Sequence, residues 1–369
     1  MDNKIKDYHY NIDFLRILFV LFVVYYHFIR AKYVIGYDLD IYNNLARNAR
    51  YIGEVCNSAL FIISGYFLSN SFVKNISLFK FAFHKLMRFW PVLFFGVCSM
   101  FILSIFKLVP FNIGANILNL FCITKVGGGL AMQFNSLTPT WFVCALFWCS
   151  LFYFTLYKII NNKYVFNFVL AILIYFNFVI YLNSPLHDYE LVGGIFSKGG
   201  CYAMANIGVG ILIKMFIEEI QNKSFNLNQP IITFIEVGLF CYLIQGFIYR
   251  FREELLVVLI SFVVLFILFI LKQGLLSKFL NNSFSKLIGK YAFSIYIMQT
   301  VIFVFFKAFL WKQEHFVINH PILIIFISLI FAIMLGVLTY HLIEEPCAKF
   351  LKKKLLDNYD SYIKISGGG

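Results

Sequence analysis

One apolar stretch near the N-terminus carries three side chains that could do chemistry. Residues 12–29 read IDFLRILFVLFVVYYHFI and include Asp13, Arg16 and His27. About 20 mostly apolar residues suffice to cross a bilayer, so this stretch is expected to be a membrane span. A charged group at membrane depth costs roughly 2.5–3.5 kcal/mol on insertion scales. The polar residues therefore indicate a functional site rather than an ordinary anchor.

The spacing of Arg16 and His27 places both side chains on one side of such a helix. They are eleven residues apart, which is three turns plus about 20° at roughly 100° per residue. At about 1.5 Å per residue they lie roughly 16 Å apart along the axis. One helix would present a cation near one membrane face and an imidazole far across the bilayer. The alternative is that Arg16 snorkels to the surface and His27 lies among head groups.

A carboxylate in the next apolar stretch is expected at a depth similar to that of His27. Within residues 52–72, Glu54, Asn57 and Ser58 are spaced i, i+3, i+4 and so share one helix face. Two interpretations stay open. Glu54 either orients or charges the imidazole of His27, or it is an ordinary carboxylate at the outer membrane surface.

A basic, aromatic segment precedes the third apolar stretch. It reads KNISLFKFAFHKLMRFWP and contains Lys80, Lys85 and Arg88, the last two spaced i, i+3. Two cations at that spacing suit a phosphate or pyrophosphate held at the membrane surface. The alternative is an interfacial amphipathic helix that contacts anionic lipid. Further along, Trp141 follows Pro139 and is expected to anchor the start of another span.

The composition is that of an all-α, polytopic membrane protein. Of the 369 residues, 61% are hydrophobic and only 13% are charged, and the mean hydropathy is +0.80. No soluble domain of this size has such a composition. The net charge of +13 comes without a nucleic-acid motif. The eight cysteines form no C-x-x-C pair and no cluster with metal-ligand spacing, so no metal site is expected.

The apolar runs predict about ten transmembrane helices. If the N-terminus is cytoplasmic, the inner segments carry 19 of the Lys and Arg residues, the outer segments carry 11, and Arg16 lies within the membrane. This bias favours both termini on the cytoplasmic side. We expect a single transmembrane domain over residues 1–355 and a tail over 356–369 that ends in a glycine remnant of cloning. The expected spans are 12–29, 52–72, 90–108, 140–160, 164–182, 194–217, 230–248, 254–271, 287–309 and 321–344.

Two further polar positions lie inside expected spans. Glu236 is about six residues into the seventh span and is expected to face the bundle interior, paired with Arg16 or with a substrate group. Ser64 and Gly65, in the middle of the second span, fit close helix packing as well as they fit chemistry.

Six segments in order resemble the acyltransferase-3 family of membrane acyltransferases. Arg16 and His27 match its R-x10-H signature, Lys85 stands where its R-x-x-R pair has the first Arg, and Leu146 and Phe147 stand where many members have acidic residues. The other matching segments are Phe61–Leu68 (FIISGYFL), Trp141–Val143 (WFV), Ile288–Tyr296 (IGKYAFSIY) and Ile343–Pro346 (IEEP).

The resemblance implies a stand-alone acyltransferase in the bacterial cytoplasmic (inner) membrane. Its donor would be acetyl-CoA on the cytoplasmic side, and its acceptor a hydroxyl of a cell-surface or lipid-linked glycan. His27 would act as general base or as a nucleophile that carries the acyl group, together with Arg16 and Glu54. The donor would be held by four side chains: Lys80, Lys85, Arg88 and Trp141.

Two other classes of protein compete with this interpretation. Arg16, Glu54, Glu236 and His27 could line the path of a proton-coupled transporter or glycan exporter. No inverted repeat or matched pair of broken helices supports that reading. A structural membrane subunit is the third class, but it leaves the alignment of Arg16 and His27 without a purpose.

Overall fold

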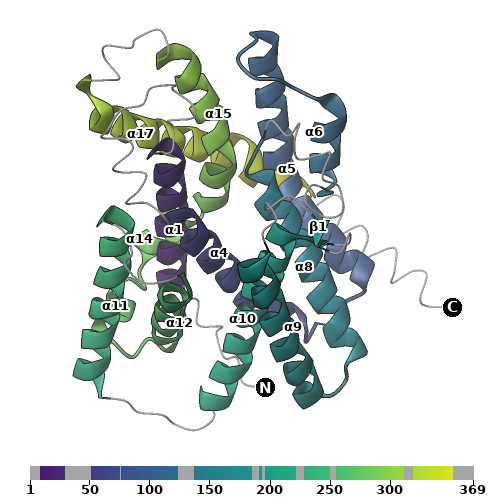
Figure 1. Cartoon of the computed structure of the whole chain (residues 1–369), viewed down its shortest axis with the longest axis vertical. Coiled ribbons are helices and arrows are strands. Elements are labelled where there is room, and N and C mark those ends of the chain that lie inside the picture. Colours follow the sequence, from purple (N-terminus) through teal and green to yellow (C-terminus); the bar gives the residue numbers. More distant parts are fainter. Residues whose placement is uncertain are drawn as a thin grey trace, which may run out of the picture. The chain divides into compact units, whose positions relative to one another are not determined.

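The computed structural model describes residues 9–29, 51–74, 76–123, 137–184, 191–192, 196–221, 228–249, 255–310 and 319–351. Nearly all of these residues are helical, with one antiparallel pair of two-residue strands, β1 (Leu191–Val192) and β2 (Phe196–Ser197) (Figure 1). The all-α class is therefore confirmed. The expected tail over 356–369 lies outside the described residues. Contacts group the chain into two units, which are taken separately below.

Unit 1 comprises Met1–Ser69, Asn206–Tyr296 and Phe309–Leu329. Three helices that it contains in part are α10 (Lys198–Gln221), α15 (Ala292–Leu310) and α17 (Pro321–Thr339). The helices that lie wholly within it are α1 (Tyr10–Ile29), α4 (Ile52–Leu68), α11 (Gln229–Tyr249), α12 (Leu255–Leu271), α13 (Leu275–Phe279) and α14 (Ser283–Gly289).

Helix α1 is the centre of unit 1 and packs against α4, α12 and α14 (Figure 1). Its first turn is fixed from outside the helix. Asn281 Oδ1 accepts a hydrogen bond from the backbone N–H of Tyr10 (2.8 Å), and Asn11 Nδ2 donates to the carbonyl oxygen of Phe269 (2.6 Å). The first N–H groups of a helix have no partner within it, so the bond to Asn281 sets where α1 begins, and the Asn11 side chain ties this turn to α12.

Unit 2 comprises Asn70–Ala205, Ile297–Ala308 and Ile330–Gly369. It includes the two strands, the short 3₁₀ turn η1 (Ser69–Ser71) and parts of α10, α15 and α17. Its other elements are α5 (Leu78–Ile105), α6 (Ile113–Leu120), α8 (Thr140–Ile159), α9 (Lys163–Asn183), the five-residue π-helix η2 (Tyr340–Glu344) and α18 (Glu345–Leu351). Helix α5 packs against α6, α8, η2 and α18.

Every expected span corresponds to a helix in the described part of the chain. Eight helices there are long and apolar enough to cross a membrane, and a bent pair, Ser283–Gly289 with Ala292–Ala308, makes a ninth. The pair bends by 41°, so the span expected at 287–309 is broken rather than straight. The span expected at 254–271 is α12, which has 17 residues and is slightly shorter than the others.

The third span differs from the expectation. We expected it to begin at residue 90, after a separate basic segment, but α5 runs without interruption from Leu78 through Pro91 to Ile105. Proline removes one backbone hydrogen bond, and membrane helices tolerate this where neighbouring groups compensate. The basic segment is therefore the first part of the span itself.

Three described helices end on a residue with a left-handed backbone that is not glycine. Lys107 (φ 58°) follows α5, Cys122 (φ 57°) follows α6 and Lys272 (φ 52°) follows α12. Such a residue costs about 1–2 kcal/mol when it has a Cβ. After α5, the N–H of Leu108 donates to the carbonyl oxygen of Leu103 (3.1 Å). The N–H of Lys107 donates to the backbone carbonyl oxygen of Ser104 (2.9 Å). This is the Schellman pattern that closes a helix end.

Candidate active site

Arg16 and His27 lie on the same unbroken helix. Because α1 is continuous from Tyr10 to Ile29, the rise of roughly 16 Å between them follows from helix geometry. The Arg16 side chain is 27% exposed, and His27 is exposed at the C-terminal end of the helix. The imidazole is therefore accessible from outside the packed interior, as a residue that acts on a substrate needs to be.

The guanidinium of Arg16 is paired within its own helix. Its Nη1 lies 2.9 Å from Asp13 Oδ1, one turn earlier, and its Cζ lies 4.9 Å from the ring centroid of Phe67. The carboxylate of Asp13 is 8% exposed, so this is a partly buried ion pair with an aromatic wall. We did not foresee Asp13 as the partner, although its i, i+3 spacing was visible in the sequence.

The glycine of the IGKYAFSIY segment packs directly on this ion pair. A Cβ placed on Gly289 would overlap the Cβ and the backbone of Asp13, so α14 approaches α1 as closely as two backbones allow. Any larger residue at Gly289 would displace Asp13, and with it the partner of Arg16. The segment therefore supports the α1 site by packing.

His27 and Glu54 lie at the same end of α1 and α4. A Cβ placed on Gly53 would lie 2.7 Å from Cε1 of Tyr26, so these two residues touch. His27 follows Tyr26, with ring centroids 5.5 Å apart, and Glu54 follows Gly53. Glu54 is exposed, as His27 is. The residues next to the carboxylate and the imidazole are therefore in direct contact, and the similar membrane depth of the two groups stays a prediction.

A partly buried hydrogen bond continues this polar face along α4. Asn57, one turn after Glu54, accepts at Oδ1 from the hydroxyl of Tyr296 (3.3 Å). Tyr296 is 4% exposed and ends the IGKYAFSIY segment. Sequence reasoning missed this contact, because its partners are 239 residues apart and nothing local links them.

Ser64 and Gly65 have a packing role in the structure. The Ser64 hydroxyl donates to the carbonyl oxygen of Leu60, one turn earlier (2.7 Å). A Cβ on Gly65 would overlap the backbone of Ile207, and a Cβ on Gly210 would overlap that of Ile62. Small residues at both positions let α4 and α10 cross at backbone contact, which is how membrane helices commonly associate.

Glu236 caps a neighbouring helix instead of pairing with Arg16. Its side chain is fully buried, and Oε2 accepts from the backbone N–H of Ser277 (3.1 Å). One turn earlier on α11, Thr233 Oγ1 accepts from the N–H of Leu275 (3.0 Å). Helix α13 begins after Gly274 and has no side-chain cap of its own. Two residues of α11 therefore satisfy the first N–H groups of α13.

Replacing Glu236 by alanine is expected to lower the free energy of unfolding by about 1–3 kcal/mol, because a buried N–H loses its acceptor. Glu236→Gln keeps a side-chain oxygen that can accept the bond from Ser277, so its free energy of unfolding should fall by less. Thermal unfolding of the detergent-solubilised protein measures both. A variant that melts like the unchanged protein but has lost its activity would instead make Glu236 part of the chemistry.

The cationic end of α5 is placed by its neighbour α8. The hydroxyl of Ser77 accepts from the N–H of Lys80 (3.2 Å) and caps the helix. Two turns on, Lys85 Nζ donates to Ser150 Oγ of α8 (3.3 Å) and lies 5.7 Å from the centroid of the Phe81 ring. Arg88, three residues after Lys85, is exposed. Ser150 is a partner that the sequence did not reveal.

Trp141 lies in the first turn of α8, away from these cations. It precedes Ser150 by nine residues, or roughly 13 Å along the helix axis. At the other end of α8, Lys158 Nζ donates to the carbonyl oxygen of Lys74, just before α5 (3.1 Å). Trp141 is therefore not brought to the level of Lys85.

The described residues contain no group of three or more His, Cys, Asp or Glu side chains that could hold a metal ion.

Comparison with known proteins identifies the family. The family model described as an acyltransferase domain, that of acyltransferase-3, matches residues 9–341. The chain belongs to the acyltransferase-3 family. It is thus a multi-pass membrane acyltransferase, and the family resemblance drawn from the six segments is confirmed. Searches of curated proteins and of solved structures found no match.

In this acyltransferase-3 protein, the resembling segments fall into two groups. The R-x10-H pair, the FIISGYFL segment and the IGKYAFSIY segment meet around α1, through Asp13, Phe67 and Gly289. The altered R-x-x-R pair and the WFV segment belong to α5 and α8, and the IEEP segment lies where η2 meets α18. Helices α8, η2 and α18 all pack against α5 in unit 2. One group holds the imidazole, and the other holds a patch of cations.

Proposed function

We propose that the protein transfers an acetyl group from acetyl-CoA, at the cytoplasmic face of a bacterial inner membrane, to a hydroxyl of a cell-surface or lipid-linked glycan. The acyltransferase activity follows from the family; the donor, the acceptor, the sidedness and the residue roles are the proposal. The observation that carries it is the cationic end of α5, where no ion pair joins Lys85 or Arg88 to a carboxylate among the described residues.

The positive charge of this part of α5 has no acidic residue near it in the sequence. No Asp or Glu occurs between Glu54 and Asp188, whereas the same stretch carries eight Lys and Arg residues. Among the described residues, no ion pair joins Lys85 or Arg88 to a carboxylate. Cations at membrane depth need a counter-charge. The phosphates of CoA would supply it, with Lys80, Lys85 and Arg88 as their donors.

Lysine at position 85 would bind a phosphate differently from the arginine of the family motif. Arginine at that position would grip a phosphate with two parallel bonds, whereas an ammonium group acts as a point charge. The hydrogen bond to Ser150 and the Phe81 ring hold that point charge in place. Trp141, in the first turn of α8 and nine residues before Ser150, would contact the pantetheine arm rather than the phosphates.

The catalytic role proposed for His27 is general base. Its Nε2 or Nδ1 would take the proton of the acceptor hydroxyl as that oxygen attacks the thioester carbonyl. The C–S bond then breaks, an ester forms, and the CoA thiolate recovers a proton from the imidazolium. An imidazole suits this exchange because its ordinary pKa is close to neutral pH. Glu54 would orient the ring, and Asp13 would hold the guanidinium of Arg16 near the start of α1.

The activity itself is tested with the purified, detergent-solubilised protein. Acetyl-CoA labelled at its carbonyl carbon is supplied with a glycan acceptor, and the label is followed into the glycan. Transfer of the label supports the proposal. Flux of glycan across proteoliposomes without any labelled product would favour an exporter and would end the proposal.

Replacing Arg88 by alanine is expected to weaken acetyl-CoA binding by about tenfold or more, because a charge-assisted bond to phosphate is lost. Lys163→Ala removes another exposed cation of unit 2, at the start of α9, and is the matched control. Isothermal titration with acetyl-CoA measures both. Equal affinities in the two variants would move the donor site away from α5.

A further inference from the structure

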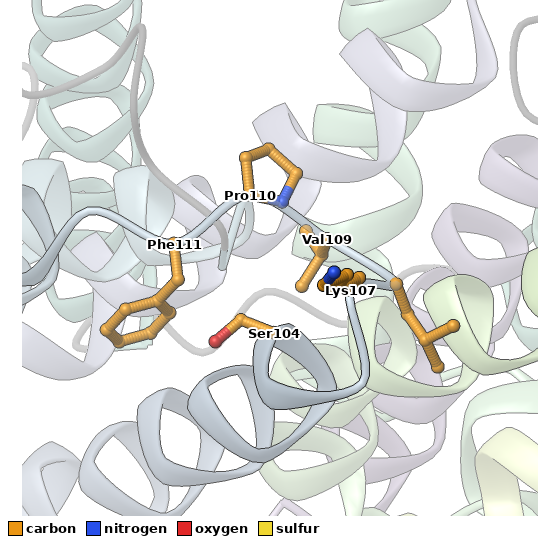
Figure 2. Close-up of a pocket in the computed structure, with 6 residues that line it drawn as sticks. Ser104, Lys107, Val109, Pro110 and Phe111 are labelled. Atoms are coloured by element: carbon orange, nitrogen blue, oxygen red, sulfur yellow. The ribbon is translucent and has the colours of Figure 1, made fainter.

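The end of α5 opposite the donor cations borders a hollow in the surface of unit 2. The hollow measures about 460 Å³ and is lined by Ser104, Lys107, Leu108, Val109, Pro110 and Phe111 (Figure 2). It begins where the span Leu78–Ile105 ends, so it lies at the level of the lipid head groups. Lys85 is twenty residues before Ile105, or roughly 30 Å along α5, so this hollow and the donor cations lie near opposite faces of the membrane.

Lys107 is the polar group of the hollow that remains available to a ligand. The Ser104 hydroxyl already donates to the carbonyl oxygen of Phe101 (2.6 Å), and the other lining residues are apolar. Lys107 itself is exposed, and no ion pair joins it to a carboxylate in the described part of the chain. With no Asp or Glu between Glu54 and Asp188, its neighbourhood in sequence offers no counter-charge either.

The backbone fixes the position of Lys107. The two Schellman bonds described above hold it in the left-handed conformation, which glycine would adopt without strain. Phe111 packs edge-on against Phe101 of α5, with ring centroids 5.3 Å apart, and so closes the hollow on one side. Figure 2 shows Phe111 beside Ser104, below Pro110.

An apolar stripe on α5 leads to the hollow. Phe94, Phe101 and Ile105 are 47%, 46% and 62% exposed, and their spacing of seven and four residues keeps them within about 40° of one another around the helix. The stripe spans eleven residues, or roughly 16 Å, which is about half of the ~30 Å hydrocarbon core. A hydrocarbon chain from one leaflet would therefore cover it.

We propose that this hollow binds the phosphate head group of a membrane lipid, with the phosphate against Lys107 and the hydrocarbon chain along the stripe of α5. A phospholipid and a polyprenyl-phosphate carrier share this chemistry. The proposal concerns binding only and does not depend on the identity of the acyl donor or acceptor.

The test measures lipid binding to the full chain in detergent by native mass spectrometry. The probes are phosphatidylglycerol, a polyprenyl phosphate, a diacylglycerol that lacks phosphate, and inorganic phosphate. We expect either phosphate lipid to bind, and the tighter of the two identifies the source. Diacylglycerol should bind at least about tenfold more weakly, because the charge-assisted bond is absent. Inorganic phosphate that competes as well as the lipids would overturn the proposal, because the stripe would then have no part in binding.

The variants isolate the charge of Lys107. Lys107→Gln and Lys107→Gly should each lose binding by about tenfold, whereas Lys107→Arg should keep it. The glycine variant removes the charge and relieves the left-handed backbone, so it is expected to fold at least as well as the unchanged protein. Lys272→Gln is the matched control, since Lys272 ends α12 with the same backbone conformation but does not line this hollow. Unchanged lipid binding by Lys107→Gly would overturn the proposal.

Discussion

Replacing His27 by glutamine is expected to reduce acyl transfer by about 10²–10⁴-fold, because a positioned general base contributes that much and glutamine cannot take up a proton. Acetyl-CoA binding should be unchanged, since the cations proposed to hold the donor belong to α5. His27 is exposed at the end of α1, so its loss removes no core contact and the protein should still fold. The measurement is labelled acetyl transfer, normalised to monodisperse protein.

The control for this variant is Tyr25→Phe, a change two residues away on α1 that removes one hydroxyl and keeps the ring. Full transfer by His27→Gln would exclude a catalytic role for the imidazole. The same labelled donor also separates the two roles proposed for His27. A base leaves no label on the protein, whereas an acyl-imidazole would leave label that hydroxylamine removes.

The sequence predicted the helices well because their signal is local. A run of apolar residues long enough to cross a bilayer is visible without any tertiary contact, and each of the ten expected spans is helical in the structure, the one at 287–309 as a bent pair of helices. The errors fall where a local signal was given too much weight. We expected the third span to begin at residue 90, yet α5 starts at Leu78 and passes through Pro91, because a membrane helix can compensate for one missing N–H.

The partners of the polar side chains were harder to predict, because most of those contacts are not local in sequence. Asp13 and Arg16 are three residues apart, so their pairing was within reach of the helix period. Glu236 and Ser277 are 41 residues apart, and Lys85 and Ser150 are 65 apart. Those contacts are made by packing between helices, which a single sequence does not encode in any local pattern. Glu236 shows the consequence, since a buried carboxylate that suggested chemistry is the cap of a short helix.

Close backbone contact between α4 and α10 fixes the helix that carries Glu54, Asn57 and Phe67. Two glycines on opposite sides of this crossing each face a backbone carbonyl of the other helix, that of Ile207 for Gly65 and that of Ile62 for Gly210. A side chain at either position meets main-chain atoms, which cannot rotate away as a flexible side chain would. The crossing therefore has no room for even a methyl group unless the helices separate.

Replacing Gly65 or Gly210 by leucine is expected to destabilise the protein by about 3 kcal/mol or more, the upper end of the range for overpacking. Gly238 provides the matched control, because it lies in the middle of α11 and no atom lies within 4 Å of a Cβ placed on it. Gly238→Leu should fold normally, since leucine favours a helix over glycine by up to about 1 kcal/mol. Thermal unfolding and size-exclusion profiles in detergent compare the three variants. If all three unfold at the same temperature, the close crossing of α4 and α10 is wrong.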